Sequence, residues 1–288
     1  MRLIRVAVAA APLLMFTFVS AHATSIERGE YLIHAGGCVD CHTADTDDAT
    51  VLAGGRAIES PFGTFYSPNI TPDVDTGIGA WTDTDFLNAF WDGVSPDGDH
   101  YYPAFPFTSY TGVSEEDLLA IKLYLFSLDP VEHATPEHEL AWYISTRLAA
   151  GAWKLSNFDA KRFVADPERS DEWNRGAYLV RHLGHCGECH TPRGKTGGFE
   201  SGRELAGNPD WPGDEKMPNI TPHRGDGIGK WSISDIEYFL DIGMLPDGDF
   251  VGSAMSPVID NSTSKLTKSD RVAIASYLKS VPPLDSDK

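Results

Sequence analysis

The sequence contains only four cysteines and five methionines among its 288 residues, and no methionine lies between Met15 and Met217. Beyond its first 23 residues, it has no apolar run long enough to suggest a membrane span. Basic residues are also few, because 23 lysines and arginines face 42 aspartates and glutamates, which gives a formal net charge of −19. This excess of acid excludes a nucleic-acid-binding protein. It favours protein partners that carry basic docking patches.

The first residues follow the pattern of a secretory signal. Arg2 and Arg5 precede a mostly apolar run over residues 6–20, and the small residues Ala21 and Ala23 follow. We therefore expect residues 1–23 to be a signal peptide that is removed after Ala23. Loss of its two arginines would change the formal charge from −19 to −21. The mature chain is predicted to be periplasmic, soluble or peripherally associated, with no remaining transmembrane segment.

The spacing of the cysteines argues against disulfide bonds. The motifs CVDCH at residues 38–42 and CGECH at residues 186–190 use every cysteine in the chain. C-x-x-C-H is the attachment signature of c-type haem, in which two thiols bond the porphyrin and the histidine ligates iron. A thioredoxin-like pair needs a βαβ context, which the sequence does not show, and one zinc site built from both pairs would leave the two adjacent histidines unexplained. The sequence thus predicts two covalently bound c-type haems, held by Cys38, Cys41, Cys186 and Cys189, with His42 and His190 as iron ligands.

Both motifs lie in an internal repeat. The phrases NITP, GIG-x-W and PDGD each occur twice at an offset of 150 residues, and the two haem motifs are offset by 148. Within each copy, Thr82-x-x-Asp85 and Ser232-x-x-Asp235 predict capped helix starts, and so do Ser114 and Thr267. A helix over residues 137–155 is expected to bridge the two copies.

No run of alternating strand residues is apparent, so we predict an all-α fold of two tandem cytochrome c-like domains joined by a bridging helix. The expected boundaries are residues 24–133 for the first domain, 134–171 for the bridging helix and linker, and 172–288 for the second domain.

The second repeat offers a thioether for its iron. Met255 follows the PDGD phrase and lies 65 residues beyond His190, at a position that can fold back over a haem. A methionine opposite histidine is common in electron-transfer cytochromes and raises the reduction potential. Met217 and Met244 fit a packing role better, so Met255 is the predicted ligand.

The same offset places Phe105 at the corresponding position of the first repeat, and phenylalanine cannot ligate iron. Three alternatives remain open. His100 could be the ligand, the iron could stay five-coordinate beneath Phe105, or a residue from elsewhere could reach it, such as His34 or a methionine of the second repeat.

Several phrases resemble those of a known family. FGTFYSPNITPDVDTGIGAW, HYYPAFPFTSYT and RGAYLVRHLGHCGECHTPRG are similar to the cytochrome c subunits of membrane-bound quinoprotein alcohol and gluconate dehydrogenases. The resemblance covers nearly the whole mature chain and implies that electrons pass from a dehydrogenase to a quinone or oxidase. This chain has two haem motifs where the family typically has three, and Phe105 where it has methionine.

These features favour a periplasmic dihaem cytochrome c that transfers electrons between a dehydrogenase partner and the respiratory chain. The alternative is a dihaem enzyme, peroxidase-like or a small-molecule oxidase, that uses an open iron beside Phe105. Asp97, Asp99 and His100 are its candidate acid–base groups, but Asp247 and Asp249 occupy the matching positions beside the predicted Met255 ligand. A sensor is a third possibility, although the sequence shows no output domain.

Overall fold

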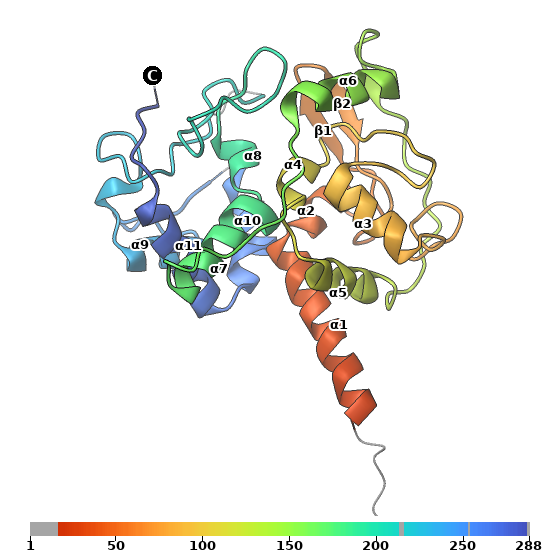
Figure 1. The fold of residues 1–288 in the computed structure, drawn as a ribbon, viewed down its shortest axis with the longest axis horizontal. Helices are drawn as coiled ribbons and strands as arrows, with labels where there is room; N and C mark the ends of the chain where they lie inside the picture. Colours follow the sequence, from red (N-terminus) through yellow and green to blue (C-terminus); the bar gives the residue numbers. More distant parts are fainter. Residues whose placement is uncertain (1–16, 213–215, 253, 287–288) are drawn as a thin grey trace, which may run out of the picture.

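The computed structural model of the chain describes residues 17–212, 216–252 and 254–286 (Figure 1). Residues 1–16, which make up most of the expected signal peptide, lie outside the described residues, and cleavage after Ala23 stays a prediction. Among the helices that are described, none combines the length and apolar character that a membrane crossing needs.

The prediction of an all-α fold is wrong. A three-stranded antiparallel sheet in the order β1-β2-β3 is formed by β1 (Ala57–Ser60), β2 (Gly63–Tyr66) and β3 (Glu139–Leu140). Its first two strands have four residues each, too few to show an alternating pattern, and the third has only two. Gly63 is required where β2 meets β3, because it has φ 119° and an added Cβ would lie 2.2 Å from the Glu139 carbonyl oxygen.

The helices of the two repeats correspond in order. The first repeat has α1 (Thr17–Ala35), α2 (Cys38–His42), α3 (Asp83–Asp92), α4 (Phe107–Tyr110) and α5 (Glu115–Leu125). The second has α7 (Asp171–Tyr178), α8 (Gly187–His190), α9 (Ile233–Ile242), α10 (Met255–Asn261) and α11 (Lys268–Ser280). A π-helical turn η1 (Leu179–Leu183) extends α7 towards α8, and short 3₁₀ turns occur at η2 (Ile228–Lys230) and η3 (Thr263–Lys265).

The predicted helix starts are confirmed. Thr82 caps α3 and Ser232 caps α9, each in a reciprocal capping box with the aspartate three residues later. Ser114 and Thr267 likewise cap α5 and α11 through their side-chain oxygens.

The predicted bridging helix over residues 137–155 is wrong in its first part. Glu139 and Leu140 form β3, and the helix α6 (Arg147–Asn157) begins ten residues later than expected. The backbone of β3 pairs with β2, so tertiary contact overrides local helical preference in this segment.

Each repeat is closed by a tight helix crossing at a glycine. An added Cβ on Gly29 of α1 would lie 2.1 Å from the Ala120 carbonyl oxygen of α5. On Gly176 of α7 it would lie 2.0 Å from the Ala273 carbonyl oxygen of α11. Only glycine therefore permits these backbone approaches, which explains why an Arg-Gly pair recurs in both repeats.

The two repeats pack directly against one another. A single cluster of buried apolar side chains draws members from both, including Leu32, Ile33, Leu118, Leu179, Leu183 and Ile274. Figure 1 shows the two sets of helices side by side, with α2 and α10 close together at the boundary.

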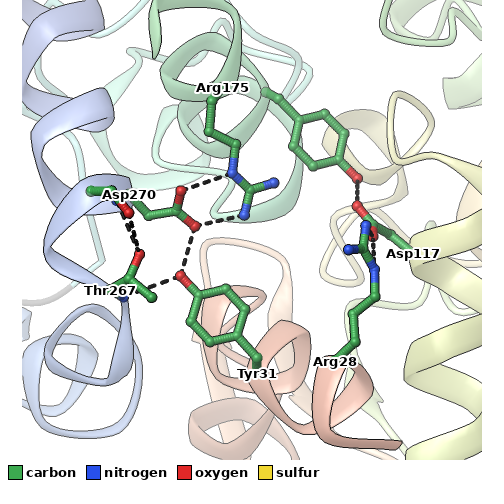
Figure 2. A network of polar contacts seen from close by, with 8 residues as sticks. Arg28, Tyr31, Asp117, Arg175, Thr267 and Asp270 are labelled. Atoms are coloured by element: carbon green, nitrogen blue, oxygen red, sulfur yellow. Dashed lines mark hydrogen bonds and ion pairs between the residues drawn. The ribbon is translucent and has the colours of Figure 1, made fainter. Parts of the chain in front are cut away.

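A matched polar network also crosses this boundary (Figure 2). Tyr31 of the first repeat donates to Asp270 Oδ2 of the second at 2.6 Å, and Arg175 binds the same carboxylate at 2.9 and 2.6 Å. Tyr178 of the second repeat donates to Asp117 Oδ2 of the first at 2.6 Å. Arg28 completes that half, with its Nη2 2.5 Å from Asp117 Oδ1.

Candidate haem sites

The first haem motif forms the short helix α2. Gly37 precedes it with φ 64°, a conformation that glycine adopts easily, and turns the chain from α1 into the motif. His42 Nδ1 lies 2.8 Å from the Pro68 carbonyl oxygen, which stands just before the NITP phrase. Because a carbonyl can only accept, Nδ1 carries the proton and the Nε2 lone pair is left for a metal.

The second motif repeats this geometry in α8. His190 Nδ1 lies 2.7 Å from the Pro218 carbonyl oxygen, just before the second NITP phrase. In both repeats, the asparagine of this phrase holds the loop: Asn69 Oδ1 accepts from the Thr71 backbone N–H at 2.9 Å, and Asn219 Oδ1 from that of Thr221 at 2.8 Å. The repeated phrase thus explains how each motif histidine is oriented.

The protonation of these groups suits haem attachment and iron ligation. Burial lowers the pKa of His42 and of His190, which keeps both rings neutral near pH 7. Burial raises the pKa of the thiols, to about 12 for Cys38 and Cys189, to about 11 for Cys186, and above its ordinary value for Cys41. All four cysteines are free of disulfide bonds. Each motif therefore offers two thiols and one neutral imidazole, the groups that a c-type haem requires.

The two motifs are close neighbours. The Gly36 carbonyl oxygen accepts from Tyr110 Oη at 2.8 Å and faces His185 Nε2 at 3.2 Å. The rings of Tyr110 and His185 are 5.3 Å apart between centroids. Residues next to Cys38 thus contact residues next to Cys186, which places the two C-x-x-C-H motifs side by side.

A reciprocal exchange of hydrogen bonds also links the motifs. Asp40, inside the first motif, accepts from Asn261 Nδ2 of α10 at 2.6 Å. Glu188, at the equivalent place in the second motif, accepts from Thr108 Oγ1 and Ser109 Oγ of α4 at 2.9 and 2.7 Å. Each repeat therefore uses the short helix after its PDGD loop to hold the other repeat's haem motif.

The structure surrounds Phe105 with aromatic rings. Ring centroids lie 5.2 Å away at Phe90, 5.7 Å at Tyr101 and 5.6 Å at Tyr110. The phenyl ring therefore continues the aromatic core at the place where the second repeat has Met255, which begins α10.

His100 faces α6, as its contacts show. Lys154 Nζ lies 3.2 Å from His100 Nδ1, and an added Cβ on Gly151 would come within 2.6 Å of His100 Cδ2. His34 Nδ1 lies 2.8 Å from the Asn261 carbonyl oxygen, at the boundary between the repeats. These contacts disfavour His100 as an iron ligand, because its ring is committed to α6.

The other two candidate methionines occupy short backbone bridges. Met217 pairs with Asn208, and Met244 pairs with Phe250. A packing role for Met217 and Met244 stays a prediction.

Two further histidines near the motifs were missed by sequence reasoning. His182 Nδ1 lies 3.0 Å from the Ser109 carbonyl oxygen, and burial lowers the pKa of both His182 and His185. The sequence feature that could have revealed them is the phrase HLGHCGECH, which holds three histidines within nine residues. Both line the boundary between the repeats.

Comparison with known proteins decides the family. A dihaem c-type cytochrome of Cereibacter sphaeroides is 44% identical over 261 residues, which cover 90% of this chain and 86% of that protein. The chain belongs to the dihaem c-type cytochromes. This dihaem cytochrome accordingly carries two covalently bound c-type haems, and the residues of both motifs fit them. No family model matches the chain.

Dehydrogenase subunits are also similar to the dihaem cytochrome, which confirms the resemblance noted from the sequence. The cytochrome subunit of a Gluconobacter japonicus fructose dehydrogenase is 40% identical over 92% of this chain and 54% of that subunit. The cytochrome c subunit of a quinone alcohol dehydrogenase from Gluconacetobacter polyoxogenes is 39% identical over 92% of this chain and 57% of that subunit. The chain thus spans about half the length of these two subunits.

Proposed function

We propose that this dihaem cytochrome accepts electrons from a dehydrogenase, passes them between its two haems, and delivers them to the respiratory chain in the periplasm. When bound, the haems supply one-electron iron chemistry. The names of the relatives support a dehydrogenase donor, since two of them are cytochrome subunits of fructose and alcohol dehydrogenases.

The side chains divide this work by their chemistry. Cys38, Cys41, Cys186 and Cys189 would anchor the haems through thioether bonds, and His42 and His190 would offer Nε2 to the iron. The carbonyl oxygens of Pro68 and Pro218 fix those rings by accepting their Nδ1 protons. Met255 supplies the second ligand in the second repeat.

The observation that carries the proposal is the adjacency of the two motifs. Tyr110 and His185 meet at the Gly36 carbonyl oxygen, between Cys38 and Cys186. In addition, Asp40 and Glu188 are each held by the opposite repeat. This interlock fixes the two sites relative to one another, as an internal electron relay requires. We assign one site to each of the domains at residues 24–133 and 172–288, with residues 134–171 joining them.

The structure does not favour the alternative of a dihaem enzyme. His100, its candidate base, is directed towards α6 and Lys154, while Phe105 is enclosed by aromatic rings. We therefore propose electron transfer alone.

Intact mass of the exported protein tests the cofactor assignment that the relay needs. The wild type should carry two haem additions, and the double variant Cys186→Ser/Cys189→Ser should carry one. The matched variant Cys38→Ser/Cys41→Ser should lose the other. A double variant that keeps both haems would contradict the assignment of each motif to one haem.

A further inference from the structure

The surface around α9 in the second repeat differs from the equivalent surface around α3 in the first. Three side chains on and after α9 are large, apolar and exposed: Tyr238, Ile242 and Phe250, with exposed fractions of 48, 50 and 60%. We call these three residues the α9 face. At an offset of 150 residues, the first repeat has polar residues at all three positions, namely Asn88, Asp92 and His100.

The backbones at these positions match, so the comparison is structural as well as sequential. α3 and α9 both end at a left-handed glycine, Gly93 with φ 58° and Gly243 with φ 74°. A bridge then joins Val94 to His100 in the first repeat, as one joins Met244 to Phe250 in the second.

In the first repeat, helix α6 lies over two of these three positions, Asp92 and His100, while Asn88 stays exposed. Lys154 Nζ of α6 donates to the carbonyl oxygens of Asp92 and Gly93 at the end of α3, and also contacts His100 Nδ1. Behind it, Phe107 packs against Phe158, with ring centroids 5.0 Å apart. A helix that presents a lysine and a small residue, Lys154 and Gly151, thus covers this part of the surface within the chain.

In the second repeat, the described part of the chain leaves the α9 face exposed, with an acidic border. Asp247 and Asp249 are exposed in the loop between Met244 and Phe250. Asp241 is already paired, with its Oδ2 3.0 Å from Arg271 Nη2. The face therefore combines an apolar centre with two exposed carboxylates at the loop, for which the described residues show no ion pair. Such a face complements an apolar surface bordered by lysine or arginine.

The α9 face also leads to the second haem site. An added Cβ on Gly243 would lie 3.2 Å from Val251 and 3.4 Å from Ile259 of α10, the helix that begins at Met255. A protein seated at Phe250 would lie next to Val251, which shares its contact at Gly243 with Ile259 of α10. The position suits electron exchange with the second haem.

We propose that the α9 face docks a redox partner protein through an amphipathic segment with apolar side chains bordered by lysine or arginine. This inference rests on the proposed electron-transfer function and adds the surface and the chemistry of the partner. A partner docked on this face would exchange electrons with the second haem, and its basic residues would lie beside Asp247 and Asp249.

Electron exchange with a lysine-rich mitochondrial cytochrome c, followed by stopped-flow absorbance, tests the proposal. The variant Tyr238→Asn/Ile242→Asp/Phe250→His gives the face the residues of the first repeat, which that backbone accommodates. Its second-order rate constant should fall about tenfold, as expected when the apolar centre of an interface is lost. Because Ile242→Asp adds an acidic charge, weaker electrostatic steering cannot account for that fall.

The control Leu148→Asn/Leu155→Asp removes two exposed apolar side chains of α6 and adds the same charge; its rate should equal that of the wild type. An unchanged rate in the α9 variant, with the potential of the second haem also unchanged, would overturn the docking face. No exchange at all by a wild type holding two haems would instead contradict the proposed function.

If the α9 face binds a second copy of the chain or a lipid surface instead, two further measurements would show it. Sedimentation equilibrium that shows a dimer abolished by the α9 substitutions would overturn the proposal in favour of a second copy of the chain. Cosedimentation with phosphatidylcholine–phosphatidylglycerol vesicles that the same substitutions abolish would overturn it in favour of a lipid surface. A monomer that does not bind vesicles, together with the slower exchange, supports it.

Discussion

The hydroxyl group of Tyr31 donates to Asp270 across 239 residues of sequence, and it also accepts from the Thr267 backbone N–H at 3.2 Å. It therefore joins α1 of the first repeat to the capped start of α11 in the second. Tyr178 does the same in reverse, donating to Asp117 and accepting from the Ser114 backbone N–H at 3.3 Å. The two repeats are locked together by this matched pair of bonds, which holds the haem motifs side by side.

Loss of the Tyr31 hydroxyl should weaken the contact between the two repeats. Tyr31→Phe removes one hydrogen bond to a carboxylate and is expected to lower the free energy of unfolding by about 1–3 kcal/mol. Urea unfolding of the haem-containing protein measures the change. Tyr143→Phe, at a side chain 56% exposed, is the matched control and should be neutral. Equal stability of wild type and Tyr31→Phe would mean that the bond does not hold the repeats together.

Acid should weaken the same network. Burial acts to raise the pKa of Asp270, but hydrogen bonds from Arg175 and Tyr31 outweigh it, and the net pKa is lowered. A lowered carboxylate pKa contributes stability that is fully present above the unfolded value of about 3.9 and is lost as the pH falls through the folded value.

Asp270→Asn should therefore be less stable than the wild type by a constant amount between neutral pH and about pH 5, and the difference should shrink below about pH 4. Urea unfolding of both proteins across this range gives the comparison. A difference that grows on acidification would contradict the assigned direction of the pKa shift.

Met255→Leu should change the second haem alone. Removal of the thioether should abolish the weak far-red absorption band of iron–methionine ligation and lower the potential of that haem. Met244→Leu, at the position that pairs with Phe250, is the control and should keep the band. Survival of the band in Met255→Leu would show that another methionine is the ligand.

The sequence predicted the parts of the protein that depend on local chemistry. Both haem motifs, the capped starts at Thr82 and Ser232, and the helices after Ser114 and Thr267 follow from residues within one turn of each other. These signals are local, because a side chain caps a helix three residues away and a motif histidine adjoins its cysteine.

The rest depends on long-range contact and could not be predicted. β3 exists because two residues after position 138 meet the edge of β2, and no local pattern marks that pairing. The bonds from Asn261 to Asp40 and from Ser109 to Glu188 likewise join residues 221 and 79 positions apart. The direction of His100 towards α6 follows only from the place where α6 packs.

A spectroelectrochemical redox titration tests the central claim that one chain holds two adjacent haem sites of unlike ligation. We expect two resolved one-electron steps in the wild type, with the far-red band of iron–methionine ligation associated with the higher-potential step only. Phe105 explains the lower step, because the first iron lacks a thioether from its own repeat, and Phe105→Met should narrow the gap. Two superimposed steps from indistinguishable histidine–methionine haems in the wild type would contradict the account.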